Sequence, residues 1–152
     1  MKIRFATIED AHAIAGNNVE LAKESENMEI SFEKTLRGVK ELIMDRQKGF
    51  YIVAEEEGKV AGQMMITYEW SDWRGRQIWW LQSIYVKREY RRKGIMKMLL
   101  EKTIKMAQQE GVALLRLYVH KDNENAMEAY KKVGMKKAPY IIYEMEMEEK
   151  IV

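Results

Sequence analysis

A basic, glycine-containing stretch, Tyr90–Met96, has the composition of a phosphate-binding turn. It follows Trp79–Val86, a run dense in aromatic and β-branched residues that is typical of a buried strand. The residues after it that recur with the spacing of one helical face are Met96, Leu99, Leu100, Thr103 and Ala107. A glycine between a strand and a helix lets the backbone approach a ligand closely, and the free N–H groups of a first helical turn attract anions. We therefore predict that a phosphate binds at this turn; the alternative is a basic turn capped by glycine that binds no ligand.

A second block of polar and aromatic residues lies downstream. Asn123, Ala126 and Tyr130 are spaced so that they share one face of a short helix, which Gly134 would end as its C-cap. The block follows another strand-like run, Ala113–Val119. The chain thus places two strand-to-helix units in succession, each with chemically useful side chains at the helix.

Together the two blocks resemble the motifs of the GNAT N-acetyltransferase superfamily. Arg91–Met96 is similar to the family's pyrophosphate loop, Arg/Gln-x-x-Gly-x-Gly/Ala, and Asn123–Met135 is similar to Asn-x-x-Ala-x-x-x-Tyr-x-x-x-Gly-Phe. The order and separation of the blocks match, and the resemblance covers nearly the whole chain. Met96 departs from the small residue of the family, so its side chain must turn into the core. Met135 replaces the usual Phe, which conserves apolar volume.

The resemblance implies that acetyl-CoA binds as a co-substrate and that no metal is involved. Its pantetheine arm would pair like an added strand with the backbone of Ile84 and Val86, which requires the fourth and fifth strands to splay apart. The N–H of Val86 would then polarise the acetyl carbonyl, and Asn123 would hydrogen-bond the pantetheine or a nearby backbone group. The cofactor-binding residues that the resemblance implies are Ile84, Tyr85, Val86, Arg91, Arg92, Lys93, Gly94, Ile95, Met96, Lys97, Asn123 and Tyr130.

Tyr130 is the residue we predict to act as a general acid. A phenol with a pKa of about 10 protonates a thiolate of about 8.5 only if the environment brings the two values together. We expect Lys131, Lys132 and the helix N-terminus to lower the pKa of Tyr130. The alternative is that Tyr130 is an aromatic side chain that only packs against the core.

A base is needed because the amine must be neutral when it attacks. The fourth strand offers only Gln82, which accepts no proton at neutral pH but could position a water molecule. Glu69, at the end of the third strand, is our first candidate and Glu29 our second. His120 titrates in the useful range, although such a histidine is more often a solvated loop residue.

The acceptor is not specified by the sequence. A group of glutamates lies where the family places the wall of its acceptor site, which would suit a cationic amine or would simply form a solvated helix face: Glu20, Glu24, Glu26, Glu29 and Glu33. Trp70 and Trp73 could line the acceptor pocket or a homodimer interface. The function that we predict is transfer of an acetyl group from acetyl-CoA to a primary amine of a small molecule or peptide, by direct attack in a ternary complex.

Two non-enzymatic functions compete with this prediction. The substitutions Gln82 and Met96 would suit a CoA-binding regulatory protein with little catalytic activity. A basic nucleic-acid-binding module is the third alternative, because Lys87–Lys105 holds eight basic and two acidic residues. These basic residues cluster around one helix start without an aromatic platform for single strands, which favours a phosphorylated cofactor over nucleic acid.

Composition narrows the remaining choices. The 152 residues are 47% hydrophobic and 33% charged, as expected for a single globular domain over 1–152. The chain has no Cys, which excludes disulfides and a thiolate nucleophile, and His12 and His120 lack ligand-spaced partners, so no metal is expected. We found neither a signal-peptide pattern nor a membrane-length apolar run, so we expect a cytoplasmic protein that does not bind membranes.

Periodicity along the chain predicts the order β-α-α-β-β-β-α-β-α-β-β. The expected strands cover 2–5, 50–55, 60–68, 79–86, 113–119 and 141–148, and the first two expected helices cover 11–22 and 32–43. Thr7 and Asp10 form an expected capping box, and Glu69–Gln77 is expected to be a loop. This is an α/β fold, a three-layer α/β/α sandwich with a mixed, mainly antiparallel sheet, and it is also the element order of the GNAT fold.

Overall fold

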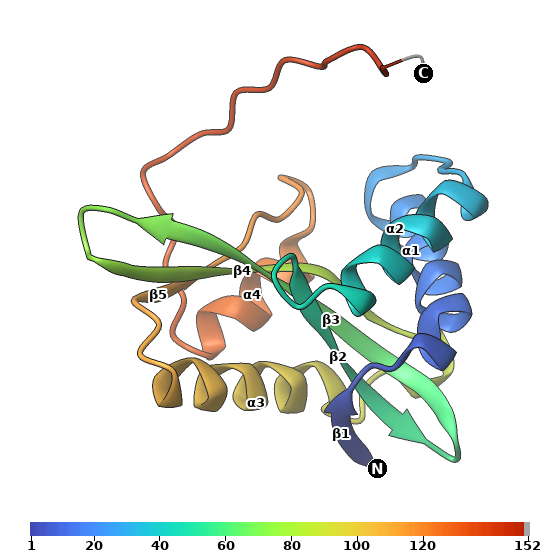
Figure 1. The fold of residues 1–152 in the computed structure, drawn as a ribbon. Helices are drawn as coiled ribbons and strands as arrows, with labels where there is room; N and C mark the ends of the chain where they lie inside the picture. Colours follow the sequence, from blue (N-terminus) through green and yellow to red (C-terminus); the bar gives the residue numbers. More distant parts are fainter. Residues whose placement is uncertain (151–152) are drawn as a thin grey trace.

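Five strands form one open sheet with helices on both faces in the computed structural model, which describes residues 1–150 (Figure 1). The elements are β1 (Lys2–Phe5), a 3-10 turn (Ile8–Asp10), α1 (Ala11–Glu26), α2 (Phe32–Met44), β2 (Gly49–Glu56), β3 (Lys59–Ser71), β4 (Arg76–Val86), a second 3-10 turn (Arg88–Tyr90), α3 (Ile95–Gln109), β5 (Leu114–Arg116) and α4 (Glu124–Lys132). Within residues 1–150, no helix combines the length and the apolar character needed to span a bilayer.

The sheet is mixed and mainly antiparallel, as predicted. Its spatial order is β1-β2-β3-β4-β5, which is also the order along the chain. The first three pairings are antiparallel, and only β4 and β5 run parallel. β5 is therefore an edge strand, and the sheet is open on that side.

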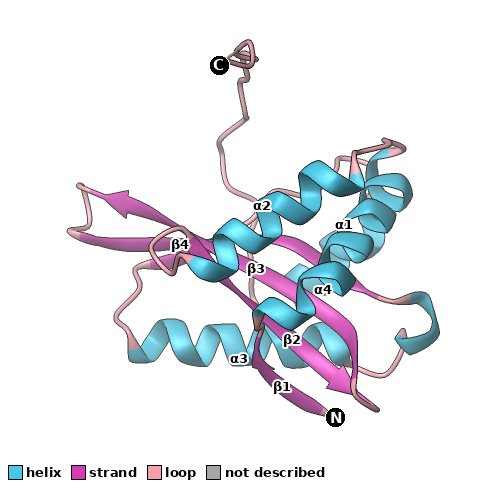
Figure 2. Ribbon diagram, turned by 45° about the vertical axis from the view of Figure 1, so that its right-hand side comes forward, coloured by secondary structure: helices cyan, strands magenta, loops and turns pink. Residues whose placement is uncertain are grey.

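Two hydrophobic cores, one on each face of the sheet, define the three layers (Figure 2). Side chains of β2 alternate between them: Tyr51 and Val53 pack under α1 and α2, whereas Ile52 packs on the face that α3 covers. Because both faces are covered, β2 reads as a continuous apolar run rather than as an alternating pattern. Trp79 and Leu81 of β4 lie in the α3-side core.

Most local predictions are confirmed, with differences at the strand ends. The capping box forms, because the N–H of Thr7 donates a hydrogen bond of 2.7 Å to the Asp10 carboxylate. The expected loop at 69–77 is wrong over most of its length. β3 and β4 continue through it, pairing Glu69 with Ile78, and only 72–75 form the turn of a long hairpin. The strand expected at 113–119 is shortened to β5, because its pairing with β4 spans three residues.

The expected strand at 141–148 is not formed, so the predicted order is wrong in its last two strands. Residues 135–150 contain no helix or strand, and residues 136–150 are exposed. An alternating apolar pattern makes a strand only where a neighbouring strand pairs with its backbone N–H and C=O groups. Within this chain the segment has no such partner among residues 1–150.

Gly62 of β3 sets how closely α3 approaches the sheet. An ideal Cβ at this position would lie 2.8 Å from Cγ2 of Ile95, the first residue of α3, and 3.3 Å from the Tyr85 carbonyl oxygen. Ile95 is only 2% exposed and its side chain is β-branched, so it has little room to move. The first turn of α3 can therefore pack this close to β3 only because Gly62 has no side chain.

We expect Gly62→Ala to destabilise the protein by about 1 to 3 kcal/mol, because the added methyl group overpacks the contact with Ile95. Urea unfolding followed by circular dichroism measures the change. Gly38→Ala is the matched control: Gly38 is an exposed position of α2, an added Cβ meets nothing within 4 Å, and the change should stabilise by about 0.5 to 1 kcal/mol. Equal effects of the two substitutions would contradict this account of Gly62.

Candidate active site

The candidate site begins where β4 and β5 separate. Their parallel pairing covers Ile78–Trp80 and Leu114–Arg116 and ends there. β4 continues to Val86, so its residues 81–86 have no strand on the β5 side among residues 1–150. The predicted cofactor-binding residues Ile84, Tyr85 and Val86 thus lie along an open strand edge, as strand addition requires.

A β-bulge interrupts β4 within this open segment. Gln63 of β3 pairs with Tyr85, and Met65 pairs with Gln82, so two steps along β3 match three along β4. The extra residue of the bulge is accommodated at Ser83, whose backbone is left-handed with a φ of 49°. A bulge re-aims the backbone groups that follow it, which here are those of Ile84 and Val86.

A buried amide network supports the bulge. Gln63 has 0% exposure, and its Nε2 donates hydrogen bonds to the Ser83 carbonyl (3.3 Å) and to Oδ1 of Asn18 (2.8 Å). Its Oε1 accepts a hydrogen bond of 3.0 Å from Asn17. Because its donors and acceptor are satisfied, Gln63 ties α1 to the bulge in one arrangement. Sequence reasoning missed this residue, although a Gln inside the apolar run of β3 was a visible signal.

The predicted phosphate turn has the expected form of a helix N-terminus. Arg92 and Gly94 both have left-handed backbones, with φ of 65° and 77°, and α3 starts at Ile95. The first hydrogen bond of the helix runs from the Met98 N–H to the Gly94 carbonyl (3.0 Å). The N–H groups of residues 95–97 therefore precede the helical ladder and are available to an anion.

The large side chain of Met96 turns into the core, as the sequence analysis required for a phosphate to approach its backbone N–H. It is half-buried and packs against the core on the α3 side of the sheet. Its side chain therefore turns away from the surface where its backbone N–H lies. The departure from a small residue at this position is accommodated by the core.

Arg91 is engaged within the protein. Its Nη2 donates to Oε1 of Glu24 (2.6 Å), and its Nε donates to the Val86 carbonyl (2.9 Å). The hydroxyl of Tyr85 donates to Oε2 of the same Glu24. Arg91 therefore joins the phosphate turn to α1 and β4, whereas Arg92, Lys93 and Lys97 are exposed at the turn. Sequence analysis had placed Glu24 only on an acidic helix face.

This cluster shifts the protonation of its members. Burial and the hydrogen bond to Glu24 raise the pKa of Tyr85 to about 12. Burial alone would raise the pKa of Glu24, but hydrogen bonds from Tyr85 and Arg91 hold it below its ordinary value of 4.5. Glu24 is thus a carboxylate at neutral pH and keeps Arg91 in place.

The second block forms the predicted helix α4. Oδ1 of Asn123 accepts a hydrogen bond of 3.2 Å from the Ala126 N–H and so caps the helix. Tyr130 is half-buried and packs against the α3-side core. Burial raises the pKa of Tyr130, so the expectation that Lys131 and Lys132 lower it is wrong. Both lysines are exposed to water, which screens their charge.

The candidate bases are held in different ways. Both oxygens of Glu69 accept hydrogen bonds, from Trp80 Nε1 (2.7 Å) and from Arg116 Nη1 (3.0 Å). Gln82 lies two residues beyond Trp80, the last residue of β4 that pairs with β5. Its Nε2 donates to the Tyr118 hydroxyl and its Oε1 accepts from Thr67, both at 3.4 Å.

The other candidates lie at the surface. Glu29 is exposed between α1 and α2, and Nδ1 of exposed His120 accepts from the Asp122 N–H (3.2 Å). Trp70 and Trp73 are exposed at the tip of the β3–β4 hairpin. Among residues 1–150, no hydrogen bond or ion pair joins any of these four side chains to the open edge of β4.

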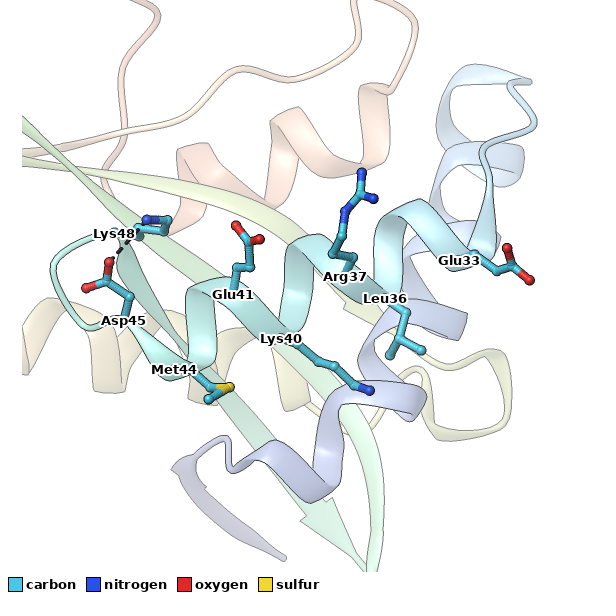
Figure 3. Close-up of a pocket in the computed structure, with 8 residues that line it drawn as sticks. All are labelled: Glu33, Leu36, Arg37, Lys40, Glu41, Met44, Asp45 and Lys48. Atoms are coloured by element: carbon cyan, nitrogen blue, oxygen red, sulfur yellow. Dashed lines mark hydrogen bonds and ion pairs between the residues drawn. The ribbon is translucent and has the colours of Figure 1, made fainter. Parts of the chain in front are cut away.

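A shallow hollow of about 510 Å³ runs along α2 and the turn after it (Figure 3). Charged residues dominate its lining, and Asp45 and Lys48 form an ion pair at one end (3.1 Å). It contains none of the predicted catalytic or cofactor-binding residues, although Glu33, one of the glutamates predicted near the acceptor site, lines it. Among residues 1–150, no group of three or more His, Asp or Glu side chains is arranged to hold a metal ion. The candidate site is therefore the open edge of β4 with the helix start beyond it.

Comparison with known proteins agrees with this geometry. The model of the acetyltransferase (GNAT) family matches residues 18–135. The chain belongs to this family. A crystal structure described as a possible acetyltransferase from Clostridium difficile 630 is 42% identical, with a TM-score of 0.90 over 97% of this chain and 98% of the other. A predicted acetyltransferase from Clostridium acetobutylicum, described as determined with acetyl-CoA, shares the fold at 14% identity, with a TM-score of 0.79 over 95% of each chain.

A named relative is similar over a shorter stretch. The thialysine N-epsilon-acetyltransferase of Bos taurus is 40% identical over 75 residues, which are 49% of this chain and 44% of that protein. This GNAT chain therefore matches about half the length of the named relative.

We expect Glu24→Gln to lower the melting temperature by a few degrees at pH 7, because it removes the charge that holds Arg91 and Tyr85. The folded-state pKa of Glu24 is lowered, so its contribution is present above its ordinary pKa of 4.5 and is lost as the pH falls through the folded value. The difference from the parent should therefore shrink in acid. Thermal melts between pH 3 and pH 7 test this, with Glu26→Gln at the exposed end of α1 as the control. A difference that is constant with pH would contradict it.

Proposed function

We propose that this protein transfers the acetyl group of acetyl-CoA to a primary amine of a small molecule or peptide, by direct attack in a ternary complex. One observation carries the proposal. The open, bulged segment of β4 leads through one short turn to a basic helix N-terminus. An extended chain with a phosphate group at one end fits that surface, and the CoA part of acetyl-CoA has this shape. Membership of the GNAT family supports the same cofactor.

The cofactor contacts that we propose follow from free backbone groups. The backbone of Ile84 and the N–H of Val86 would face the pantetheine arm, since the Val86 carbonyl already accepts from Arg91. The N–H groups of residues 95–97 would bind the pyrophosphate together with Arg92 and Lys93. Arg91 acts through the turn, because its guanidinium is occupied by Glu24 and Val86. Asn123 uses its Oδ1 to cap α4, which leaves its amide N–H₂ for the pantetheine.

The acetyl transfer then needs charge stabilisation and one proton donor. The N–H of Val86 would stabilise the oxyanion as the amine attacks the thioester carbonyl. Tyr130 would protonate the departing thiolate of CoA. Burial raises the pKa of the phenol, which weakens it as an acid. The same dry surroundings disfavour the thiolate anion and so raise the pKa of the departing sulfur, which restores the match.

We propose that a water molecule beside Gln82 accepts the proton of the amine and passes it to bulk solvent, which later returns a proton to the Tyr130 phenolate. Gln82 lies where the open edge begins, and its amide can orient water although it accepts no proton. Glu69 stays the sequence-based candidate for the base, but its use requires that the bond from Trp80 or Arg116 breaks. In the free protein Glu69 orients those two side chains.

A cationic acceptor is the substrate class that we favour. The relative from Bos taurus is named for acetylating the ε-amine of thialysine, which is an aliphatic primary amine. Exposed glutamates on α1, on α2 and between them would attract a positive charge: Glu20, Glu26, Glu29 and Glu33. A CoA-binding regulator without turnover is the second candidate, favoured by the occupied oxygens of Glu69. Turnover of acetyl-CoA with a panel of polyamines, lysine derivatives and peptides separates the two.

We expect Gly94→Glu to abolish binding of acetyl-CoA, because it places a carboxylate at the proposed pyrophosphate site. Calorimetry with acetyl-CoA measures the loss. Gly75→Glu is a matched control: Gly75 also has a positive φ (65°, against 77° at Gly94), and an added Cβ meets nothing within 4 Å at either position. Normal affinity in Gly94→Glu would show that this turn is not the phosphate site. No heat with the parent protein would overturn the cofactor assignment.

We expect Tyr130→Phe to keep the affinity for acetyl-CoA within a few-fold and to lower kcat by about 10²-fold, because the ring still packs while the proton is lost. Steady-state kinetics with the best acceptor separate kcat from KM. Tyr68→Phe provides the control, since Tyr68 packs against the same core and donates to the Arg46 carbonyl (3.2 Å). An unchanged kcat in Tyr130→Phe would make Tyr130 a packing residue.

A further inference from the structure

Gln63 is a buried amide in a part of β3 that is otherwise apolar. It interrupts the run from Val60 to Ile66, and its exposure is 0%. An apolar side chain of similar shape would fill the same space without any need for hydrogen-bond partners, so an amide here adds nothing to stability that an apolar residue could not supply. A residue that breaks the local pattern in this way is expected at functional sites. Its partners indicate which function it serves.

One partner of Gln63 is the bulge of β4. The extra residue of a β-bulge is left unpaired in the ladder, and Nε2 of Gln63 donates its hydrogen bond of 3.3 Å to the carbonyl of that residue, Ser83. Ser83 is not a glycine, yet its φ is 49°. Such a backbone conformation persists where the surrounding structure imposes it. The bond from Gln63 is a direct restraint on this residue.

Two asparagines of α1 fix the direction in which this amide points. Asn17, which is 3% exposed, donates to Oε1 of Gln63 (3.0 Å), and Oδ1 of Asn18 accepts from Nε2 (2.8 Å). Asn18 is held in turn, because its Nδ2 donates to the hydroxyl of buried Tyr51 (3.3 Å). With its oxygen facing the donor of Asn17, Gln63 turns its N–H₂ group toward the Ser83 carbonyl.

The segment that follows Ser83 carries the backbone N–H proposed to stabilise the oxyanion. The N–H of Lys87 donates to a carbonyl of β3 (2.9 Å). Successive N–H groups of an extended strand point to alternate edges, so the N–H of Val86 points to the open side. The Val86 carbonyl accepts from Arg91 (2.9 Å). The segment is therefore held at both ends, by Gln63 at Ser83 and by Arg91 at Val86.

We propose that Gln63 is a positioning residue for acetyl transfer: it holds the Ser83 carbonyl and thereby aims the Val86 N–H at the point where the oxyanion forms. This role rests on the proposed function. The oxyanion forms only as the amine attacks, so a poorly aimed N–H lowers kcat more than it lowers the affinity for acetyl-CoA. The proposed pyrophosphate contacts lie at the start of α3 and do not involve Gln63.

Gln63→Met tests the role, because it keeps the length of the side chain and removes its hydrogen bonds. We expect kcat to fall by about 10- to 100-fold, as for a displaced oxyanion donor, and Kd for acetyl-CoA to stay within about threefold. Thr103→Val is the matched control. Thr103 also has 0% exposure, and its hydroxyl donates to the Leu99 carbonyl (2.9 Å) inside α3. This control should lose stability in urea as Gln63→Met does and should keep its kcat.

The bond to Ser83 can also be measured without turnover. Ser83–Ile84 is the one Ser-Ile pair in the sequence, so carbonyl-¹³C serine and ¹⁵N isoleucine labels give a single HNCO signal. Loss of a hydrogen bond moves a carbonyl carbon upfield, so we expect this signal to move in Gln63→Met and to stay in place in Thr103→Val. Asn17→Ala leaves Gln63 present but removes the donor that orients it. It should move the same signal and lower kcat by a smaller factor, and it replaces Gln63→Met if that variant does not fold.

The outcomes separate this role from the acetyl-transfer proposal. An active parent with an unchanged kcat in Gln63→Met, or an unmoved Ser83 signal, would overturn the role of Gln63 and leave acetyl transfer intact. A kcat loss of equal size in Thr103→Val would make Gln63 a structural residue, which also overturns the role. Absence of turnover in the parent with every acceptor would overturn acetyl transfer itself, and the positioning role with it.

Discussion

The short parallel pairing of β4 and β5 is the constraint on which the rest of this structure depends. Three residues of each strand pair, and then the strands separate. Separation leaves free backbone groups along part of β4, inside the sheet, where most folds keep strands paired because open edges attract other chains. Here the edge is protected by its position: the sheet continues on the β3 side, and α3 and α4 cover one face. A narrow, directional surface for an extended ligand results.

Helix α1, on the face of the sheet opposite to α3, fixes the positions of the β4 bulge and the phosphate turn. Gln63 and Asn18 join it to the bulge at Ser83, and Glu24 joins it to Arg91 in the phosphate turn. Both links combine buried or charged polar groups with defined partners, so each has essentially one satisfied arrangement. Because the acidic residues proposed to attract the acceptor belong partly to α1, the acceptor side and the cofactor side share one rigid support.

The proton chemistry of the site is set by burial more than by neighbouring charge. The half-buried Tyr130 has a raised pKa, although two lysines follow it in sequence. Those lysines are exposed and screened by water, whereas desolvation acts on the phenol directly. With Tyr130 and Gln82 in the roles proposed above, the site would have a weak acid beside a desolvated leaving group and an amide in place of a base, and it would depend on positioning. The energetic work of catalysis in such a site would come from the oriented Val86 N–H and from holding the two substrates together.

The two motif blocks, the helix faces and the long strands could be predicted from sequence, because each depends on residues close to one another in the chain. The N-cap at Asn123, the left-handed Gly94 and the burial of Met96 are local properties of this kind. Glu69 could be located on the third strand, but its two bonds could not be predicted, since Trp80 and Arg116 come from other strands. Glu24 and Gln63 gained their roles in the same way, through partners tens of residues away.

The C-terminal segment shows the limit most clearly. Alternation from Ile141 to Met147 determined that the segment suits an extended conformation with one apolar side. Whether it becomes a strand depends on a partner for its backbone, and sequence periodicity contains no information about which edge is free. Only the tertiary structure decided that β5 ends the sheet and that the segment leads away from it. Local patterns determine which conformations a stretch of chain can adopt; the pairing of distant backbone groups decides which one is stable.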